Sequence, residues 1–144
     1  AWDGRGALRP LLDLVDVAMP NEREAQGVTG CADPEEALAA LAAAMRPGAL
    51  AVVKLGDKGC IARRAGSEER WAVPAARVDV VDATGAGDAW NAGFIHALVQ
   101  GLPVEACLRA GCAGGTVAVQ RLGGCEDMPS FRAAFDEAWQ APEP

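Results

Sequence analysis

Asp88 is the residue of this chain best suited to chemistry, because it directly follows the small residues Gly85, Ala86 and Gly87. A glycine turn can adopt positive φ and lets an anion approach the backbone, while the first N–H groups of a following helix attract negative charge. A carboxylate in the first helical turn can also serve as a general base. A base beside a phosphate-binding turn suggests phosphoryl transfer to a hydroxyl group.

A structural interpretation of these residues stays open beside the catalytic one. Aspartate is common in first turns because it complements the helix dipole, and Gly-Ala-Gly can be a plain connection between a strand and a helix. A short glycine motif alone does not decide between the two interpretations.

The elements around this turn are predicted to be a strand and two helices. The apolar run 78–81 predicts a strand before the turn. The pattern from Gly85 to Gln100 predicts a helix that ends at Gly101, and Pro103 opens a second helix towards Val119. The first helix is expected to bury three large side chains, those of Trp90, Phe94 and Leu98. Small residues give the second helix a smooth face, which permits close packing: Gly111, Ala113, Gly114 and Gly115.

Composition indicates one ordinary globular domain. The chain has 144 residues, of which 51% are hydrophobic and 23% charged. A formal net charge of -7 argues against nucleic acid or an anionic membrane as a partner, since both require basic surface. Five cysteines without a CxxC pair, and one histidine, are typical of reduced thiols in a cytosol. No apolar run approaches bilayer length, so we expect a soluble, cytoplasmic protein.

Asn21 and Glu24 form a second candidate site. They follow a predicted short strand, 15–19, and Pro20. On a helix their spacing puts an amide and a carboxylate on one face, near the end of a strand where α/β sheets hold ligands. On the residues alone, the pair is better explained as an N-cap and its capping-box partner.

Lys54, Gly56 and Gly59 form a third candidate site, which follows a predicted apolar strand, 49–55. The two glycines flank a polar tip between two apolar runs, which describes a β-hairpin as well as a nucleotide loop. Four further elements are predicted: a first element marked by an apolar pattern over 8–15, a helix capped by Asp33 and Pro34 that runs to Arg46, an edge strand within 66–73, and a last helix over 131–139.

The sequence Asp-Ala-Thr-Gly-Ala-Gly-Asp, residues 82–88, followed by Ala-Trp-Asn-Ala-Gly-Phe, resembles the C-terminal signature of the ribokinase-like (PfkB) carbohydrate kinases. Two positions depart mildly from the usual signature: Ala83 stands where threonine is usual, and Trp90 where phenylalanine is usual. Pro-Asn-Glu-x-Glu-Ala, the 54–59 segment and the closing segment 121–129 resemble further motifs of the family in the same order.

The resemblance implies a ribokinase-like three-layer α/β/α fold with a mainly parallel sheet, of which residues 1–144 would be the C-terminal, nucleotide-binding and catalytic part. The abrupt start of the chain supports this expectation, and the sugar-binding half and lid would lie upstream. The implied reaction is transfer of the ATP γ-phosphate to a hydroxyl of a small carbohydrate such as ribose, fructose or 2-keto-3-deoxygluconate. Asp88 would be the general base, and the amides of Gly85, Ala86, Gly87 and Asp88 the anion hole.

By the same resemblance, Asn21 and Glu24 lie near the phosphates, with Glu24 holding Mg²⁺ through water. Lys54, Gly56 and Gly59 would border the nucleotide. Gly111 would border the adenine, although a polar residue often stands at that position. A monovalent cation, K⁺ being the candidate, would be held by Asp82, Thr84, Ala118 and Gly123. Three alternatives stay open: a non-catalytic nucleotide-binding or regulatory module, a nucleoside kinase, and a structural domain that binds nothing. A full-length homodimer is also left open.

Overall fold

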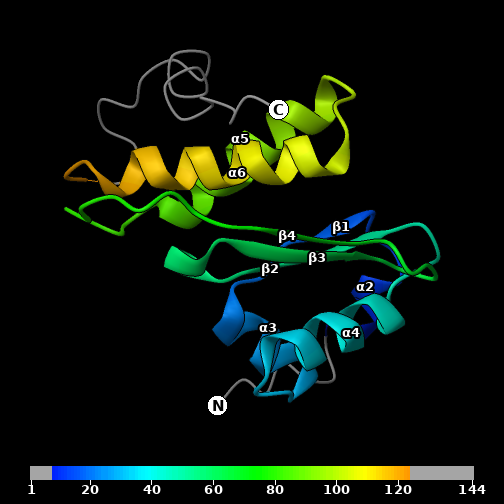
Figure 1. The fold of residues 1–144 in the computed structure, drawn as a ribbon. Coiled ribbons are helices and arrows are strands. Elements are labelled where there is room, and N and C mark those ends of the chain that lie inside the picture. Colours follow the sequence, from blue (N-terminus) through cyan, green and yellow to red (C-terminus); the bar gives the residue numbers. More distant parts are fainter. Residues whose placement is uncertain (1–7, 124–144) are drawn as a thin grey trace. The chain divides into compact units, whose positions relative to one another are not determined.

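The structure is a computed structural model that describes residues 8–123 (Figure 1). The chain divides into two compact units, Ala1–Ala72 and Val73–Pro144, and each is described by itself. Three predictions lie outside the described residues: the last helix over 131–139, Cys125, and most of the closing segment 121–129. None of the helices within residues 8–123 is long and apolar enough to cross a membrane.

The described part of the first unit is a sheet with helices packed on it (Figure 1). The strand order is β1-β2-β3-β4. In chain order its elements are α2 (Arg9–Leu12), β1 (Val17–Ala18), α3 (Glu22–Thr29), α4 (Pro34–Ala44), β2 (Leu50–Lys54), the 3-10 turn η1 (Gly56–Lys58), β3 (Cys60–Arg64) and β4 (Arg70–Val73).

The sheet is mixed, whereas a mainly parallel sheet was expected. β1 pairs with β2 in parallel, with Val17 opposite Leu50. β2 pairs with β3 antiparallel, with Val52 opposite Ala62. The antiparallel pair follows from the short tip at η1, because so few residues can reverse the chain but cannot make a parallel crossover. The hairpin interpretation of this segment is therefore confirmed.

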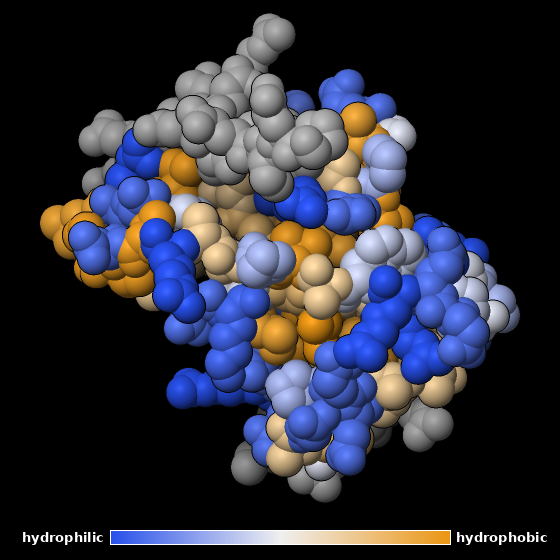
Figure 2. Space-filling model, in the orientation of Figure 1, coloured by the Kyte–Doolittle hydropathy of each residue, from blue (hydrophilic) through white to orange (hydrophobic). Residues whose placement is uncertain are grey.

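The core of the first unit lies where α4 covers the sheet. Asp33 caps α4 by accepting hydrogen bonds from the N–H groups of Glu35 (2.9 Å) and Glu36 (3.0 Å), and Pro34 occupies its first turn, as predicted. The buried cluster joins one face of α4 to β2 and β3 and includes Leu38, Leu41, Val53 and Ile61. Hydrophilic residues lie over the outer side of α3 and at the first turn of α4, whose later exposed positions are the alanines Ala39 and Ala43 (Figure 2). Burial of this one apolar face positions both helices on the sheet.

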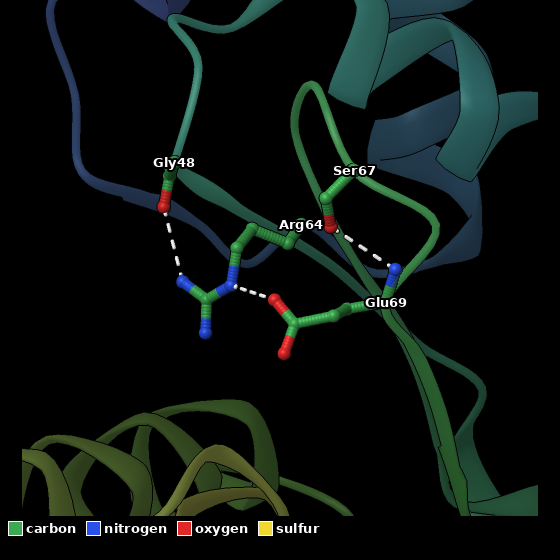
Figure 3. Close-up of polar contacts among 4 residues, drawn as sticks. All are labelled: Gly48, Arg64, Ser67 and Glu69. Atoms are coloured by element: carbon green, nitrogen blue, oxygen red, sulfur yellow. Dashed lines mark hydrogen bonds and ion pairs between the residues drawn. The ribbon is translucent and has the colours of Figure 1, made fainter.

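Arg64, the last residue of β3, holds the turn into β4 (Figure 3). Its Nε donates to Glu69 Oε2 at 2.6 Å, and its Nη1 donates to the carbonyl of Gly48 at 3.1 Å. The guanidinium also lies 5.6 Å from the centroid of the Trp71 ring. Ser67 Oγ accepts from the N–H of Glu69 at 3.0 Å. β4 is last in the strand order, which agrees with the predicted edge strand.

The described part of the second unit consists of two helices packed closely together, α5 (Ala86–Val99) and α6 (Val104–Val119). Their boundaries agree with the prediction, because Gly101 has a positive φ of 73° after α5 and Pro103 precedes α6. The rings of Trp90 and Phe94 stack at 5.5 Å, and both side chains are buried. The small face of α6 serves helix packing, since a Cβ on Gly114 would lie 2.4 Å from the carbonyl oxygen of Ala89.

Two predictions about the second unit are wrong. Residues 78–81 form no strand in the described structure, and Val80 and Val81 are 62% and 60% exposed. A strand needs a partner along its length, but the N–H groups of Val81 and Asp82 both donate to a single carbonyl, that of Val119, at 2.7 and 3.2 Å. Leu98 is 42% exposed rather than buried, because the buried stripe of α5 passes through Phe94 and Ala97 instead.

Candidate functional site

Gly85 starts α5 in the conformation that the glycine motif predicts. It has φ 75° and ψ -4°, in the left-handed region that favours glycine, and no side chain of the described residues caps the helix. The N–H of Ala86 donates to Ala83 at 3.3 Å and that of Ala89 to Gly85 at 2.9 Å. The amides of Gly87 and Asp88 lie between them, in the first turn, where helix N–H groups lack partners within the helix. This turn therefore has the features of an anion-binding site.

Asp88 is the third residue of α5 and is exposed. Its carboxylate thus lies in the same helical turn as the amides of Gly87 and Ala86, as the sequence analysis expects. It does not point into packed hydrocarbon, which would have contradicted a role in chemistry. An exposed carboxylate in the same turn as the amides of Gly87 and Asp88, which lack partners within the helix, can accept a proton from a hydroxyl group that attacks a bound phosphate.

Asp82 fixes the segment that leads into this turn. Its Oδ1 accepts from the N–H of Thr84 at 2.8 Å, and its Oδ2 accepts from the N–H of Gly123 at 3.1 Å. These hydrogen bonds, first those from the N–H and hydroxyl of Thr84 and then that from Gly123, lower the pKa of Asp82 below its usual value. Asp82, Thr84 and Gly123, three of the four residues predicted to hold a monovalent cation, are therefore brought together.

Ala118, the fourth residue of that predicted set, has a carbonyl that already closes the end of α6. It accepts hydrogen bonds from the N–H groups of Gln120 and, at 3.2 Å, Arg121. The carbonyl that meets the Asp82 segment belongs to the next residue, Val119. Val119 could not be predicted from the sequence, because its contact uses only backbone atoms and its residue type gives no signal.

Gly111 lies beneath the indole of Trp90 in the helix pair. A Cβ on Gly111 would lie 2.6 Å from Cε2 of Trp90, and Gly111 itself is buried. Packing against Trp90 therefore accounts for a glycine at this position. A role of Gly111 beside the adenine stays a prediction.

Asn21 and Glu24 form the capping box of α3. Asn21 Oδ1 accepts from the N–H of Glu24 at 2.9 Å, and Glu24 Oε2 accepts from the N–H of Asn21 at 2.8 Å. The structural interpretation of this pair is confirmed. A metal role is compatible with it, because both side chains are exposed and Glu24 Oε1 is not part of the box. Within residues 8–123, no group of three or more His, Cys, Asp or Glu side chains could hold a metal ion by itself.

Lys54 lies beside Asn21 at the end of β2. The two residues form an isolated parallel bridge, and the N–H of Lys54 donates to the carbonyl of Pro20 at 2.9 Å. The structure thus brings two separate predicted motifs to one edge of the sheet. The tip that follows is compact: Gly56 and Gly59 have positive φ of 61° and 95°, and the N–H of Leu55 donates to Gly59 at 2.8 Å.

Comparison with known proteins agrees with this arrangement. A model of the pfkB family of carbohydrate kinases matches residues 1–130. A ribokinase of Arabidopsis thaliana is 39% identical over 130 residues, which cover 87% of this chain and 34% of that protein. A cytidine kinase of Thermococcus kodakarensis is 36% identical over 107 residues, which cover 74% of this chain and 38% of that protein.

A solved structure supports the fold. The structure of Arabidopsis thaliana ribokinase complexed with ribose and ATP matches with a TM-score of 0.79 at 32% identity, covering 91% of this chain and 43% of that one. The chain thus spans well under half the length of each of these three proteins. The predicted ribokinase-like α/β fold is confirmed, and the chain belongs to the pfkB family of carbohydrate kinases.

Proposed function

We propose that this chain supplies the nucleotide-binding and catalytic part of an ATP-dependent kinase that phosphorylates a hydroxyl group of a small sugar. The observation that carries the proposal is the first turn of α5. There the uncapped amides of Gly87 and Asp88 and the exposed Asp88 carboxylate occur together, after a left-handed Gly85. A turn of this kind offers both a grip for a phosphoryl group and a base for its acceptor.

In the proposed reaction, the acceptor oxygen forms a bond to the γ-phosphorus while the bond from that phosphorus to the bridging oxygen of ATP breaks and ADP leaves. Asp88 takes the proton of the attacking hydroxyl. The amides of Gly85, Ala86, Gly87 and Asp88 donate to the phosphoryl oxygens, where negative charge is spread in the transition state. Mg²⁺, which Glu24 would hold through water, would neutralise further phosphate charge.

The first unit would contribute contacts with the nucleotide and metal. Glu24 would hold Mg²⁺ through water with Asn21 beside it, since carboxylate and amide oxygens suit this ion. Lys54 would neutralise phosphate charge, with Gly56 and Gly59 bordering the nucleotide. In the second unit, Gly111 would border the adenine. Asp82, Thr84, Ala118 and Gly123 would surround a K⁺ ion.

The acceptor belongs to the proposal as well, and ribose, fructose and 2-keto-3-deoxygluconate are the candidates. A nucleoside acceptor is the second candidate function, because the cytidine kinase relative is 36% identical over most of this chain. We place the activity in the cytoplasm, with ATP and the acceptor as its small-molecule partners. If the chain instead serves as a non-catalytic module, it would bind a nucleotide without transferring phosphate to any acceptor.

Transfer of labelled γ-phosphate tests the proposal. The 144-residue chain and its full-length parent protein should be incubated with ATP and Mg²⁺ and with each of ribose, fructose, 2-keto-3-deoxygluconate and cytidine. The proposal predicts a phosphorylated sugar with the full-length protein and nucleotide binding by the chain. Phosphorylated cytidine alone would favour the nucleoside kinase, and nucleotide binding without any transfer would favour the non-catalytic module.

A further inference from the structure

A groove in the first unit lies apart from the residues of the proposed kinase site. It is formed between α4 and the turn from β3 into β4, and its volume of about 350 Å³ is in the range of small-molecule sites. We call it the Arg63 groove. Its lining combines small residues of α4 with polar residues at the end of β3 and in the turn: Ala39, Ala42, Ala43, Arg63, Ser67 and Glu68.

The register of the hairpin places this groove away from the nucleotide motifs. β3 runs antiparallel to β2, with Cys60 opposite Lys54 and Arg63 opposite Ala51. Arg63 therefore lies three residues, or about 10 Å, along the sheet from the end where Lys54 and Asn21 meet. The groove and the proposed contacts with the nucleotide share no residue.

Arg63 lies on the side of the sheet that α4 covers. Side chains alternate along a strand, so Arg63 shares a face with Ile61 and, just beyond β3, Ala65, which both belong to the buried cluster under α4. On the α4 side of the groove stand alanines such as Ala39 and Ala43, whose methyl groups leave space that larger side chains would fill. The Arg63 side chain is 35% exposed. A cation thus stands at the edge of an apolar core, partly withdrawn from water.

The guanidinium of Arg63 keeps hydrogen-bond donors for a ligand. Within residues 8–123 its ion pair is with Glu68, where 3.7 Å between Nη2 and Oε1 is too long for a hydrogen bond and the Glu68 side chain is fully exposed. The neighbouring Arg64, in contrast, donates hydrogen bonds through Nε and Nη1 at 2.6 and 3.1 Å. Exposed ion pairs contribute little to stability, so a ligand carboxylate can displace that of Glu68.

Ser67 supplies a second donor at the turn (Figure 3). Its Oγ accepts from the N–H of Glu69 at 3.0 Å, which leaves the hydroxyl hydrogen for another acceptor. Guanidinium and hydroxyl groups both donate, whereas the alanine wall is apolar. The planar fork of an arginine can bind both oxygens of a carboxylate at once. The lining therefore matches a carboxylate attached to a short apolar chain.

We propose that the Arg63 groove is a binding site for a small organic acid with one carboxylate and a short apolar chain. The carboxylate binds to Arg63 and Ser67 in place of Glu68, and the apolar chain lies along the alanines of α4. The site is independent of the proposed kinase reaction, because it uses none of the residues assigned to that reaction. Inorganic phosphate is the competing ligand, since arginine binds it as well.

NMR titration of the 144-residue chain with butyrate tests this site. The Nε–H signal of Arg63 and the backbone N–H signal of Ser67 should shift and saturate as butyrate is added. Butyramide has the same size without the charge, and it should cause no saturable shift. Saturable binding of butyramide, or butyrate shifts that grow linearly without saturation, would overturn the inference. Inorganic phosphate that saturates the same signals at a lower concentration than butyrate would overturn the choice of an organic carboxylate.

Two variants change the affinity for butyrate in opposite directions. Arg63→Gln should raise the dissociation constant by about tenfold or more, the effect expected for losing a charge-assisted hydrogen bond. Glu68→Gln removes the competing carboxylate and should lower the dissociation constant by about twofold to fivefold, in keeping with the small strength of exposed ion pairs. Unfolding curves establish that each variant is folded.

The ion pair of Arg109 and Glu105 on α6 supplies matched controls. It is exposed, with 2.8 Å between Nη2 and Oε1, and it lies outside the groove. Arg109→Gln and Glu105→Gln should therefore leave the dissociation constant for butyrate unchanged. An unchanged constant in Arg63→Gln, or an equal rise in Arg109→Gln, would show that butyrate does not bind in the Arg63 groove.

Discussion

The backbone of Gly93 in α5 packs directly against the carbonyl group of Ala110 in α6, and a Cβ atom on Gly93 would lie 2.3 Å from that oxygen. No side-chain movement can relieve such a contact, because both atoms are fixed by helical backbone. The short distance between α5 and α6 therefore requires glycine, which has only a hydrogen atom as its side chain, at position 93. The close packing of the two helices in the second unit depends on this residue.

Gly93→Ala should consequently lower the free energy of unfolding by about 1–3 kcal/mol, the range for overpacked cores. The measurement is urea denaturation followed by circular dichroism. Gly115→Ala in α6 is the matched control, since its Cβ would meet its neighbours at an ordinary 3.5 Å. There the better helix propensity of alanine predicts a gain of up to about 1 kcal/mol. Equal effects at the two glycines would show that the helices do not pack as described.

The capping box at Asn21 and Glu24 allows structural and metal roles to be separated. Asn21→Ala removes the acceptor for the Glu24 N–H and should lower the stability of the chain by about 1 kcal/mol in thermal unfolding. Glu24→Gln keeps an oxygen that can accept from the Asn21 N–H, so α3 should keep its stability. Only the binding of Mg²⁺ should become weaker. We expect the Mg²⁺ concentration for half-maximal nucleotide binding to rise about tenfold. Glu22→Gln, on the same helix, is the control, and an equal rise there would refute the assignment of Glu24.

The thiols of Cys31 and Cys107 should react at very different rates. Cys107 is fully buried, its Sγ lies 3.4 Å from the carbonyl oxygen of Leu102, and burial raises the pKa of its thiol above the usual value. Since the thiolate is the nucleophile, iodoacetamide at about pH 8 should label the half-buried Cys31 first. Peptide mass mapping over time measures both rates. Faster labelling of Cys107 would show that α6 opens readily.

Stability in acid should depend on Asp82. Its pKa is lowered in the folded chain, so its stabilising effect is present above the unfolded value near 3.9 and is lost as the pH falls through the lower folded value. The difference in stability between wild type and Asp82→Asn should therefore be largest at a pH above the unfolded pKa and should shrink progressively as the pH falls below it. Urea unfolding at a series of pH values measures it. A difference that grows on acidification would contradict the hydrogen bonds at Asp82.

Elements with local signals could be predicted from the sequence. Asp33 with Pro34, and Gly85 with Gly101, mark their helix ends through short-range backbone chemistry, and α4 and α5 begin where these residues indicate. The tip between Gly56 and Gly59 is local in the same sense. The order of the family motifs along the chain predicted the ribokinase-like fold, and the comparisons confirm this fold.

Features that depend on distant partners could not be predicted. Val80 and Val81 have the composition of a strand, but strand formation requires a neighbouring strand, which no residue type announces. The contact of Asp82 with Gly123 likewise joins residues 41 apart through a backbone N–H. The side chain of Leu98 has the apolar character of a core residue, yet its place on α5 leaves it exposed.

Asp88→Asn in the full-length protein tests the central claim most directly, in a single-turnover assay of γ-phosphate transfer with ATP binding measured in parallel and Asp79→Asn as the control. We predict that the affinity for ATP is retained while the rate of transfer falls by about 10²–10⁴-fold, the contribution expected of a general base. An unimpaired rate of transfer in Asp88→Asn would contradict the account.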